Sequence, residues 1–204
     1  MKTVLKPYYP NFRNIFDYIA WDDGHFQWDV YDVKEYDGFD FYTMNMTSQQ
    51  WLTDVDVDRP IWWHTICIAV PHHMDEEMGN SGLLTIDGGF HDNDPLTGHP
   101  IYPESNINAA AMGKIAKDTG GIAANIYFVP NQRIKFMHEW DEKYIDKGRA
   151  EDQIIAYTWK RFIDTPNVGP QTDEPFWLVR FPMVKAAIKA MDAISQWNTE
   201  QVRD

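Results

Sequence analysis

The stretch of this chain with the clearest chemical character is residues 83–92, where a short apolar run ends in two glycines followed by polar residues. Gly88 and Gly89 lack a Cβ, so their backbone N–H groups can approach a ligand or a reacting oxygen closely. Together with Phe90 they form a candidate oxyanion loop, because fixed backbone donors stabilise a developing negative charge. The alternative interpretation is that the two glycines only allow a sharp exit from a buried strand.

A nucleophile that could use such a loop is not apparent in the sequence. The serines are Ser48, Ser81, Ser105 and Ser195, and none lies in a Gly-x-Ser-x-Gly turn between a strand and a helix. A Ser-His-Asp triad therefore cannot be assembled from the pattern of residues. We expect no catalytic side chain in this chain.

His91, Asp92 and Asp94 form a second candidate site within the same loop. Carboxylates favour Ca²⁺, and a histidine among them suits a transition metal. The spacing matches no EF-hand, however, and loops rich in Asp and Asn are common as turns. We expect no cofactor, and Ca²⁺ stays the candidate ion for these three residues.

Four other polar positions each have a structural and a functional interpretation. Cys67 lies in an apolar run and is expected to be a buried, inert thiol. His64 is expected to be a hydrogen-bonded core or rim residue rather than a base. The adjacent His72 and His73 point to opposite sides of an extended chain, which disfavours a shared metal. Asn45 begins an Asn-Met-Thr sequon and is a candidate for N-glycosylation.

Composition excludes several classes of function. The formal net charge of −13 disfavours binding to nucleic acid or to an anionic membrane surface. No apolar run approaches the roughly 20 residues that a membrane-spanning helix requires. The first residues lack the apolar core of a signal peptide. Hydrophobic residues make up 44% of the chain, which is too many for a disordered protein.

The periodicity of apolar residues predicts strands alternating with helices. Residues 1–40 are expected to form an aromatic and acidic lead-in with one short helix, followed by residues 41–204 with the sheet and its helices, all in one incomplete domain. The expected strands are residues 39–46, 61–70, 83–87 and 122–129, and the expected helices are residues 11–18, 107–118 and 149–163. Pro182 is expected to open a further helix. Its predicted buried stripe is Val184, Ala187, Ile188, Met191, Ile194 and Trp197.

Apolar strands alternating with helices indicate an α/β fold, with a mostly parallel sheet and helices on both faces. The order of elements matches the N-terminal half of an α/β-hydrolase-like sheet. In that topology residues 83–87 form a central strand, and the strand beyond it is missing here. Because an open apolar edge promotes aggregation, we expect either a second polypeptide or self-association to complete the sheet beside Leu83 to Asp87.

Several segments in the same order resemble the PhoPQ-activated pathogenicity-related protein family, which includes secreted autocrine proliferation repressors. These segments are MTSQQWL (46–52), DRPIWWH (58–64), VPNQ (129–132), EDQIIAYTW (151–159), FPMVKA (181–186) and AMDA (190–193). The resemblance runs from about Phe16 to Trp197 and covers the N-terminal half of a typical member. It implies a hydrolase-like fold and an extracellular or periplasmic location. The chain departs from the family pattern after Gly89, where Phe90 and His91 follow.

Two functional hypotheses remain. The first is a non-catalytic hydrolase-like scaffold that acts in a larger assembly or as a secreted regulatory protein. The second is the N-terminal part of a split or processed serine hydrolase, acting on peptides or esters, whose nucleophile and triad lie on the other half. The sequence favours the first, because it contains no identifiable nucleophile, acid or base.

Overall fold

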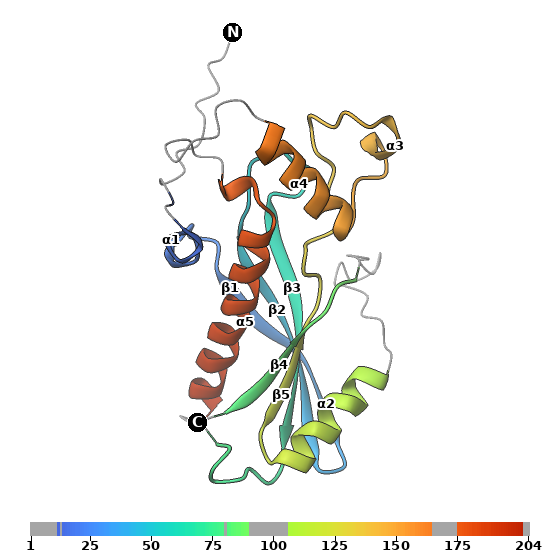
Figure 1. Ribbon diagram of the computed structural model, residues 1–204. Coiled ribbons are helices and arrows are strands. Elements are labelled where there is room, and N and C mark those ends of the chain that lie inside the picture. The colour runs from blue at the N-terminus through green and yellow to red at the C-terminus, as the bar shows by residue number, and fades with distance from the viewer. Residues whose placement is uncertain (1–11, 13, 80, 90–105, 165–174, 202–204) are drawn as a thin grey trace.

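The protein is a mixed α/β structure built around one five-stranded sheet, seen here in a computed structural model (Figure 1). The structure describes residues 12, 14–79, 81–89, 106–164 and 175–201. The strands are β1 (Gln27–Tyr36), β2 (Phe39–Gln50), β3 (Ile61–Pro71), β4 (Gly82–Ile86) and β5 (Ile122–Ile126). The helices are α1 (Ile15–Ala20), α2 (Asn106–Thr119), α3 (Glu142–Ile145), α4 (Asp152–Asp164) and α5 (Arg180–Gln201), with a 3-10 turn η1 (Pro175–Trp177) before α5.

The order of strands across the sheet is β1-β2-β3-β5-β4, and only the pair β4–β5 is parallel. The expectation of a mostly parallel sheet is therefore wrong, because β1–β2, β2–β3 and β3–β5 are antiparallel. For β1 and β2 the cause is their short connection. A two-residue turn joins β1 to β2, with Gly38 at φ +85°, and such a turn can only reverse the chain. The parallel pair is connected through a helix, α2.

The four strands expected from the sequence are present as β2, β3, β4 and β5, but β1 was not expected. Trp28 and Val30 alternate with polar residues and pack against the larger core, but most of the strand is exposed. A register shift between Val30 and Asp32 interrupts the alternation, so the period-2 signal of a buried face is short. Backbone pairing with β2 continues along the whole strand. Tertiary pairing, rather than local sequence, therefore creates this edge strand.

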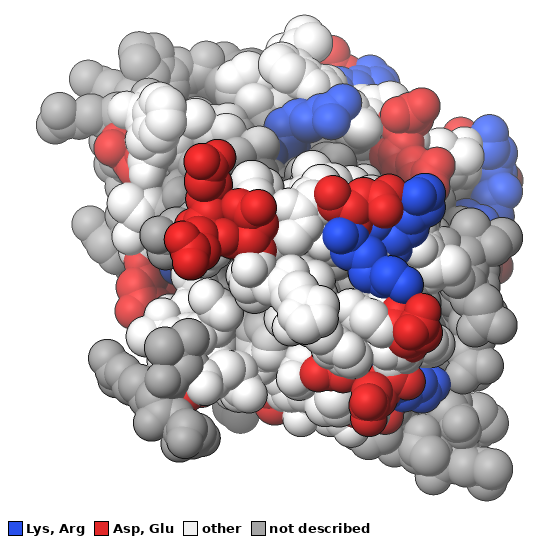
Figure 2. All heavy atoms as spheres, turned by 90° about the horizontal axis from the view of Figure 1, so that it is seen from below, with Lys and Arg blue, Asp and Glu red and all other residues white. Residues whose placement is uncertain are grey.

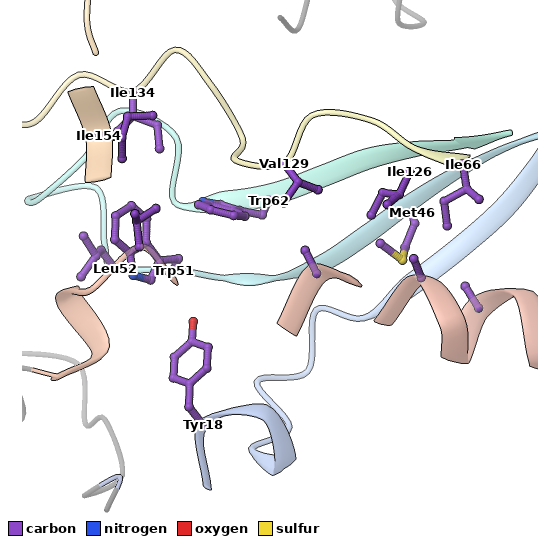
Figure 3. Packing of buried hydrophobic residues seen from close by; sticks show 14 of the residues in the cluster. Tyr18, Met46, Trp51, Leu52, Trp62, Ile66, Ile126, Val129, Ile134 and Ile154 are labelled. Carbon is purple, nitrogen blue, oxygen red and sulfur yellow. The ribbon is translucent and has the colours of Figure 1, made fainter. Parts of the chain in front are cut away.

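The sheet buries both of its faces, as the sequence predicted. Residues at alternate positions of β2, β3 and β5 face α5 and form the larger core, which includes Met46, Trp62, Ile66 and Ile126 (Figure 3). The residues between them face α2 on the other side of the sheet (Figure 1). This smaller core contains Phe39, Phe41, Cys67, Ala69, Met112, Ala116, Ala123, Tyr127 and Phe128. β3 is buried along nearly its whole length because both cores pack against it.

Helix α5 buries a different stripe from the one expected. Of the predicted stripe only Trp197 is buried, and the buried residues are Pro182, Lys185, Ala186, Ala190, Ala193 and Trp197. Small side chains bring the helix close to the sheet, where larger side chains from the strands fill the space between them. Most residues of the bulkier stripe do not face the sheet, and Val184 and Met191 are exposed.

Lys185 fixes the N-terminal segment to α5. Its Nζ donates to the carbonyl oxygen of Trp21 at 2.7 Å and to the carboxylate of Asp23 at 3.0 Å, and both charged side chains are almost completely buried. Burial lowers the pKa of Lys185, and the ion pair with Asp23 opposes that shift. A lysine on the inner side of a helix is compatible with folding here because a partner with the opposite charge is present.

Gly113 offers a test of the contact between α2 and the sheet. A Cβ at this position would lie 2.1 Å from the ring of Phe39. We predict that Gly113→Ala lowers the free energy of unfolding by about 1–3 kcal/mol through overpacking, which outweighs the roughly 1 kcal/mol gained in helix propensity. Urea denaturation measures this difference.

The control is Gly79→Ala, whose Cβ would meet only backbone oxygens at 3.7 Å. We expect its stability to stay within about 0.5 kcal/mol of the natural protein. A Gly113→Ala variant as stable as this control would show that α2 does not lie closely against Phe39.

Candidate functional site

The glycine loop lies where the parallel strands β4 and β5 both end. Backbone hydrogen bonds continue the ladder past the strands, from Phe128 N–H to the Gly88 carbonyl at 2.9 Å and from Val129 N–H to the Asp87 carbonyl at 3.1 Å. The carboxyl ends of parallel strands are where open α/β sheets bind ligands. The geometry therefore makes this edge the candidate functional site of the described chain.

Of the three proposed oxyanion donors, one is already occupied within the chain. The Gly88 N–H donates to its neighbour, the Asp87 carboxylate, at 2.8 Å. Gly89 has φ +102°, a conformation that favours glycine, and a Cβ there would touch the Phe128 ring at 3.5 Å. Phe90 lies outside the described residues. The Gly89 N–H makes no hydrogen bond to another described residue, and its role as an oxyanion donor stays a prediction.

Gln132 holds this loop against the start of α4, and the sequence analysis did not single it out as a site residue. Its Nε2 donates to the Gly89 carbonyl at 2.8 Å and to Glu151 Oε1 at 3.3 Å. Its Oε1 accepts from the Glu151 N–H at 2.7 Å. Gln132 is completely buried, so one amide joins three segments. The available signal was its place in the segment VPNQ, which contributed to the family resemblance.

Two non-glycine residues beside the loop adopt positive φ angles. Phe128 has φ +65° and Glu151 has φ +46°. Such conformations are uncommon for residues with a Cβ, and they persist only where the surrounding contacts hold them. Phe128 is held by its bond to Gly88, and Glu151 by its bond to Gln132. The carboxyl edge of β4 and β5 is thus a rigid, preorganised region.

Arg149 pairs with Glu139, ten residues earlier in the chain. Its guanidinium binds the Glu139 carboxylate with two hydrogen bonds of 2.6 and 2.8 Å. Burial alone raises the pKa of Glu139, but the bonds from Arg149 and from backbone N–H groups outweigh it and lower the pKa. Tyr144 and Tyr157 lie against the guanidinium. This ion pair stabilises residues 133–150. Glu151 forms its hydrogen bonds with Gln132 instead.

Ser48 and His64 are the serine and histidine that the described chain brings together. Ser48 Oγ and His64 Nε2 are 3.0 Å apart, and His64 Nδ1 lies 3.1 Å from the Tyr127 carbonyl. With Nδ1 donating to that carbonyl, Nε2 accepts from the serine. Both residues are completely buried, so no substrate reaches the hydroxyl. The expectation that His64 is a hydrogen-bonded core residue is confirmed.

The remaining predicted positions fall into three groups. His91, Asp92 and Asp94 lie outside the described residues, and within the described ranges no cluster of three metal-ligating side chains occurs. His72 bonds Asp40 at 3.1 Å. Asn45 lies on β2 between β1 and β3, with its Oδ1 buried, and its glycosylation stays a prediction. No helix in the described part of the chain is long and apolar enough to cross a membrane.

The geometry defines a mixed α/β protein with a preorganised glycine loop at the carboxyl edge of its parallel strands. This chain belongs to the PhoPQ-activated pathogenicity-related protein family, whose model matches residues 15–203. The resemblance proposed from the sequence is confirmed.

One curated relative and one solved structure place this membership in context. Autocrine proliferation repressor protein A of Dictyostelium discoideum is 29% identical over 181 residues, which are 89% of this chain and 32% of that protein. This chain thus spans about a third of the length of that curated relative, as the 32% coverage shows. A crystal structure of a candidate acetyl xylan esterase from Bacteroides fragilis NCTC 9343 has 12% sequence identity and a TM-score of 0.46, over 89% of this chain and 40% of that one.

The burial of His64 predicts a dependence of stability on pH. Burial lowers the pKa of His64 from its ordinary value of 6.5 to about 4, against the opposing effect of its bond to Tyr127. Between these values the unfolded chain binds a proton that the folded chain does not, so acid favours unfolding. We expect His64 to contribute a loss of about 3 kcal/mol as the pH falls from about 6.5 to 4.

Urea denaturation at a series of pH values measures this contribution, with His64→Gln as the comparison. The variant keeps every other titrating group, so its stability should fall less steeply over the same interval. Equal slopes for the two proteins would show that His64 does not titrate as its burial requires.

Cys67 provides a second test of the packing. It is buried between β3 and α2, and burial raises the pKa of its thiol to about 12. Since the thiolate is the reactive form, we predict that iodoacetamide at pH 8 leaves the folded protein unmodified and alkylates it fully in urea. Intact mass spectrometry reads the result. Rapid alkylation of the folded chain would contradict the packing of α2 over Cys67.

Proposed function

We propose that this chain is a non-catalytic hydrolase-like scaffold that pairs the free edge of β4 with a further polypeptide in a larger assembly. The order β2-β3-β5-β4, with α2 and α5 on opposite faces, agrees with the first half of an α/β-hydrolase-like sheet. The name of the Dictyostelium relative refers to autocrine repression of proliferation. The proposal therefore includes a secreted, regulatory form of this assembly.

The single observation that carries the proposal is the edge of β4. This strand pairs with β5 on one side and is the last strand of the sheet. Leu83 is 45% exposed and Ile86 is 58% exposed. β4 also carries no charged residue, bulge or proline of the kind that normally protects an edge strand from pairing. A strand of this composition favours a partner strand.

The burial of Ser48 supports the non-catalytic part of the proposal. Its hydroxyl is bonded to a histidine of low pKa, yet neither group is in contact with solvent. Ser195, on α5, donates to the Met191 carbonyl one turn earlier. Neither Ser48 nor Ser195 thus offers an accessible nucleophile beside the glycine loop, which supports the scaffold proposal.

The alternative is a split or processed serine hydrolase, with the nucleophile and triad on the polypeptide that pairs with β4. One observation favours it. The Gly89 carbonyl is fixed by Gln132, and its N–H makes no hydrogen bond to another described residue. A preorganised, unused donor at the carboxyl edge of a parallel strand is what an oxyanion site requires.

The mass of the native particle shows whether this chain is part of an assembly or exists alone. We predict that the tagged protein, purified from its natural source, migrates as a particle heavier than the 23.9 kDa of this chain. Ile86→Lys should return it to 23.9 kDa, because a charge on an edge strand blocks pairing. The control is Val33→Lys on β1, the opposite edge, where the side chain is 52% exposed. A natural protein that runs at 23.9 kDa by itself would refute the proposal.

The same particle distinguishes the two hypotheses. Ester and peptide substrates are added to the purified assembly and to the isolated chain. No turnover by either supports the scaffold, whereas turnover by the assembly that disappears with Ile86→Lys supports the split hydrolase.

A further inference from the structure

Helix α5 carries two apolar faces, and its own sheet buries one of them. The buried face consists mainly of small residues and Lys185. The other face contains Val184, Ile188 and Met191, three of the bulkier residues that the sequence predicted as the core stripe. Met191 is 49% exposed, and Ile194 beside it is partly buried against the larger core. Exposed bulky apolar residues at helical spacing on a helix of a folded protein indicate a contact surface.

This second face forms one wall of a groove of about 500 Å³. The other wall is the sheet at β4 and β5, on the side that faces α5. The lining residues are Gly79, Ser81, Gly82, Leu83, Leu84, Ile122, Ala124, Met191, Ile194, Ser195, Asn198 and Thr199. None of them is charged, in a chain of which 24% is charged. Seen from below, one patch is acidic, others combine adjoining acidic and basic groups, and uncharged surface lies between them (Figure 2).

The groove exists because α5 lies toward the other side of the sheet. The helix packs over β2, and Gln196 on its far flank accepts a hydrogen bond of 2.9 Å from the Trp28 indole of β1. Leu84 and Ile122, beneath the groove, are therefore less completely covered than the centre of the sheet. A sheet of this kind normally buries both faces under helices.

The shape of the groove fits a helix. Met191, Ile194, Ser195, Asn198 and Thr199 follow the i, i+3, i+4, i+7, i+8 spacing of a single ridge along α5. Such a ridge packs between the side-chain ridges of a neighbouring helix whose axis lies about 8–10 Å away. The rim residues Ser195 and Asn198 are uncharged, so the facing stripe needs no opposite charge.

Connection handedness accounts for the face of the sheet on which α5 itself lies. β4 leads to β5 through α2, on one face of the sheet, and α5 follows β5 on the other. About 98% of crossovers between parallel strands are right-handed. A parallel strand on the free side of β4 would thus connect to β5 across the α5 face. The end of α5 also lies beside the start of β4 (Figure 1).

A second copy paired edge to edge through β4 would leave the groove open. Two β4 edges paired across a two-fold axis would extend the sheet, but each α5 would remain over its own β2. The partly exposed surface of β4 would then lie between the two helices without a cover. An occupant that brings a further helix to this face closes the groove.

We propose that this groove docks an amphipathic helix, with an uncharged apolar stripe, of the same polypeptide whose strand pairs with β4. The inference rests on the scaffold function proposed above. We expect the docked helix to correspond to a segment of the curated relative outside the matched residues, because the match covers 32% of that protein. The unmatched part of the relative is long enough to contain both a strand and a helix.

A fluorescent label in the groove tests the inference. Met191→Cys introduces a thiol at an exposed position while Cys67 stays buried, so a polarity-sensitive dye attaches at one site. The probe is the polypeptide of the curated relative outside the 181 matched residues. We expect its addition to shift the emission of the dye to the blue. The control dye at Gln196→Cys, on the far flank of α5, should not respond.

Ser195→Arg, an exposed change on the same wall, should weaken binding of the probe roughly tenfold or more, because it places an unpaired charge in an apolar contact. Binding of the probe without a change in the emission of the dye at position 191 would overturn the docking proposal and leave the scaffold proposal intact. Absence of binding would overturn both proposals. A shift that grows with the concentration of the labelled chain alone would identify a second copy as the occupant and overturn the inference.

Discussion

The structure depends on one constraint, which is that β4 has hydrogen-bonding groups on two sides and a strand partner on one. Its partner β5 is buried along its whole length between the two cores, whereas β4 is exposed at both ends. Pairing with β5 fixes the direction of β4 and therefore the position of the glycine loop that follows it. The groove beside α5 and the candidate site both adjoin this strand.

Buried polar groups hold the rest of the molecule around this sheet. Lys185 with Asp23 attaches the N-terminal segment to α5, and Arg149 with Glu139 stabilises the segment before α4. Gln132, an uncharged residue, attaches the glycine loop to the start of α4 in a similar way. Each of these groups would be costly to bury alone, and each is satisfied by a partner from another segment of the chain. They therefore specify one arrangement of the segments more sharply than apolar contacts do.

The sequence predicted the elements with strong periodicity and failed where another segment supplies the stabilisation. β3 was found because a mostly apolar run is typical of a strand buried on both faces. β1 was missed because a register shift interrupts its apolar alternation after Val30, and pairing with β2 forms the rest of the strand. The loop at Gly88 was identified from its residue types. Its clamp, Gln132, could not be identified, since a single glutamine carries no pattern and its three bonds reach across the fold.

By itself, the sequence determined the family, the strands that form the core, the place of the glycine loop and the inert character of Cys67, because residue types and local spacing encode these properties. Only the tertiary structure decided the mixed direction of the strands, the burial of Ser48 with His64 and the side of α5 that meets the sheet. The helix shows the physical reason most clearly. Its most apolar stripe satisfies the local pattern, but close packing against filled strands favours small side chains, and a distant carboxylate makes a buried lysine compatible with that face.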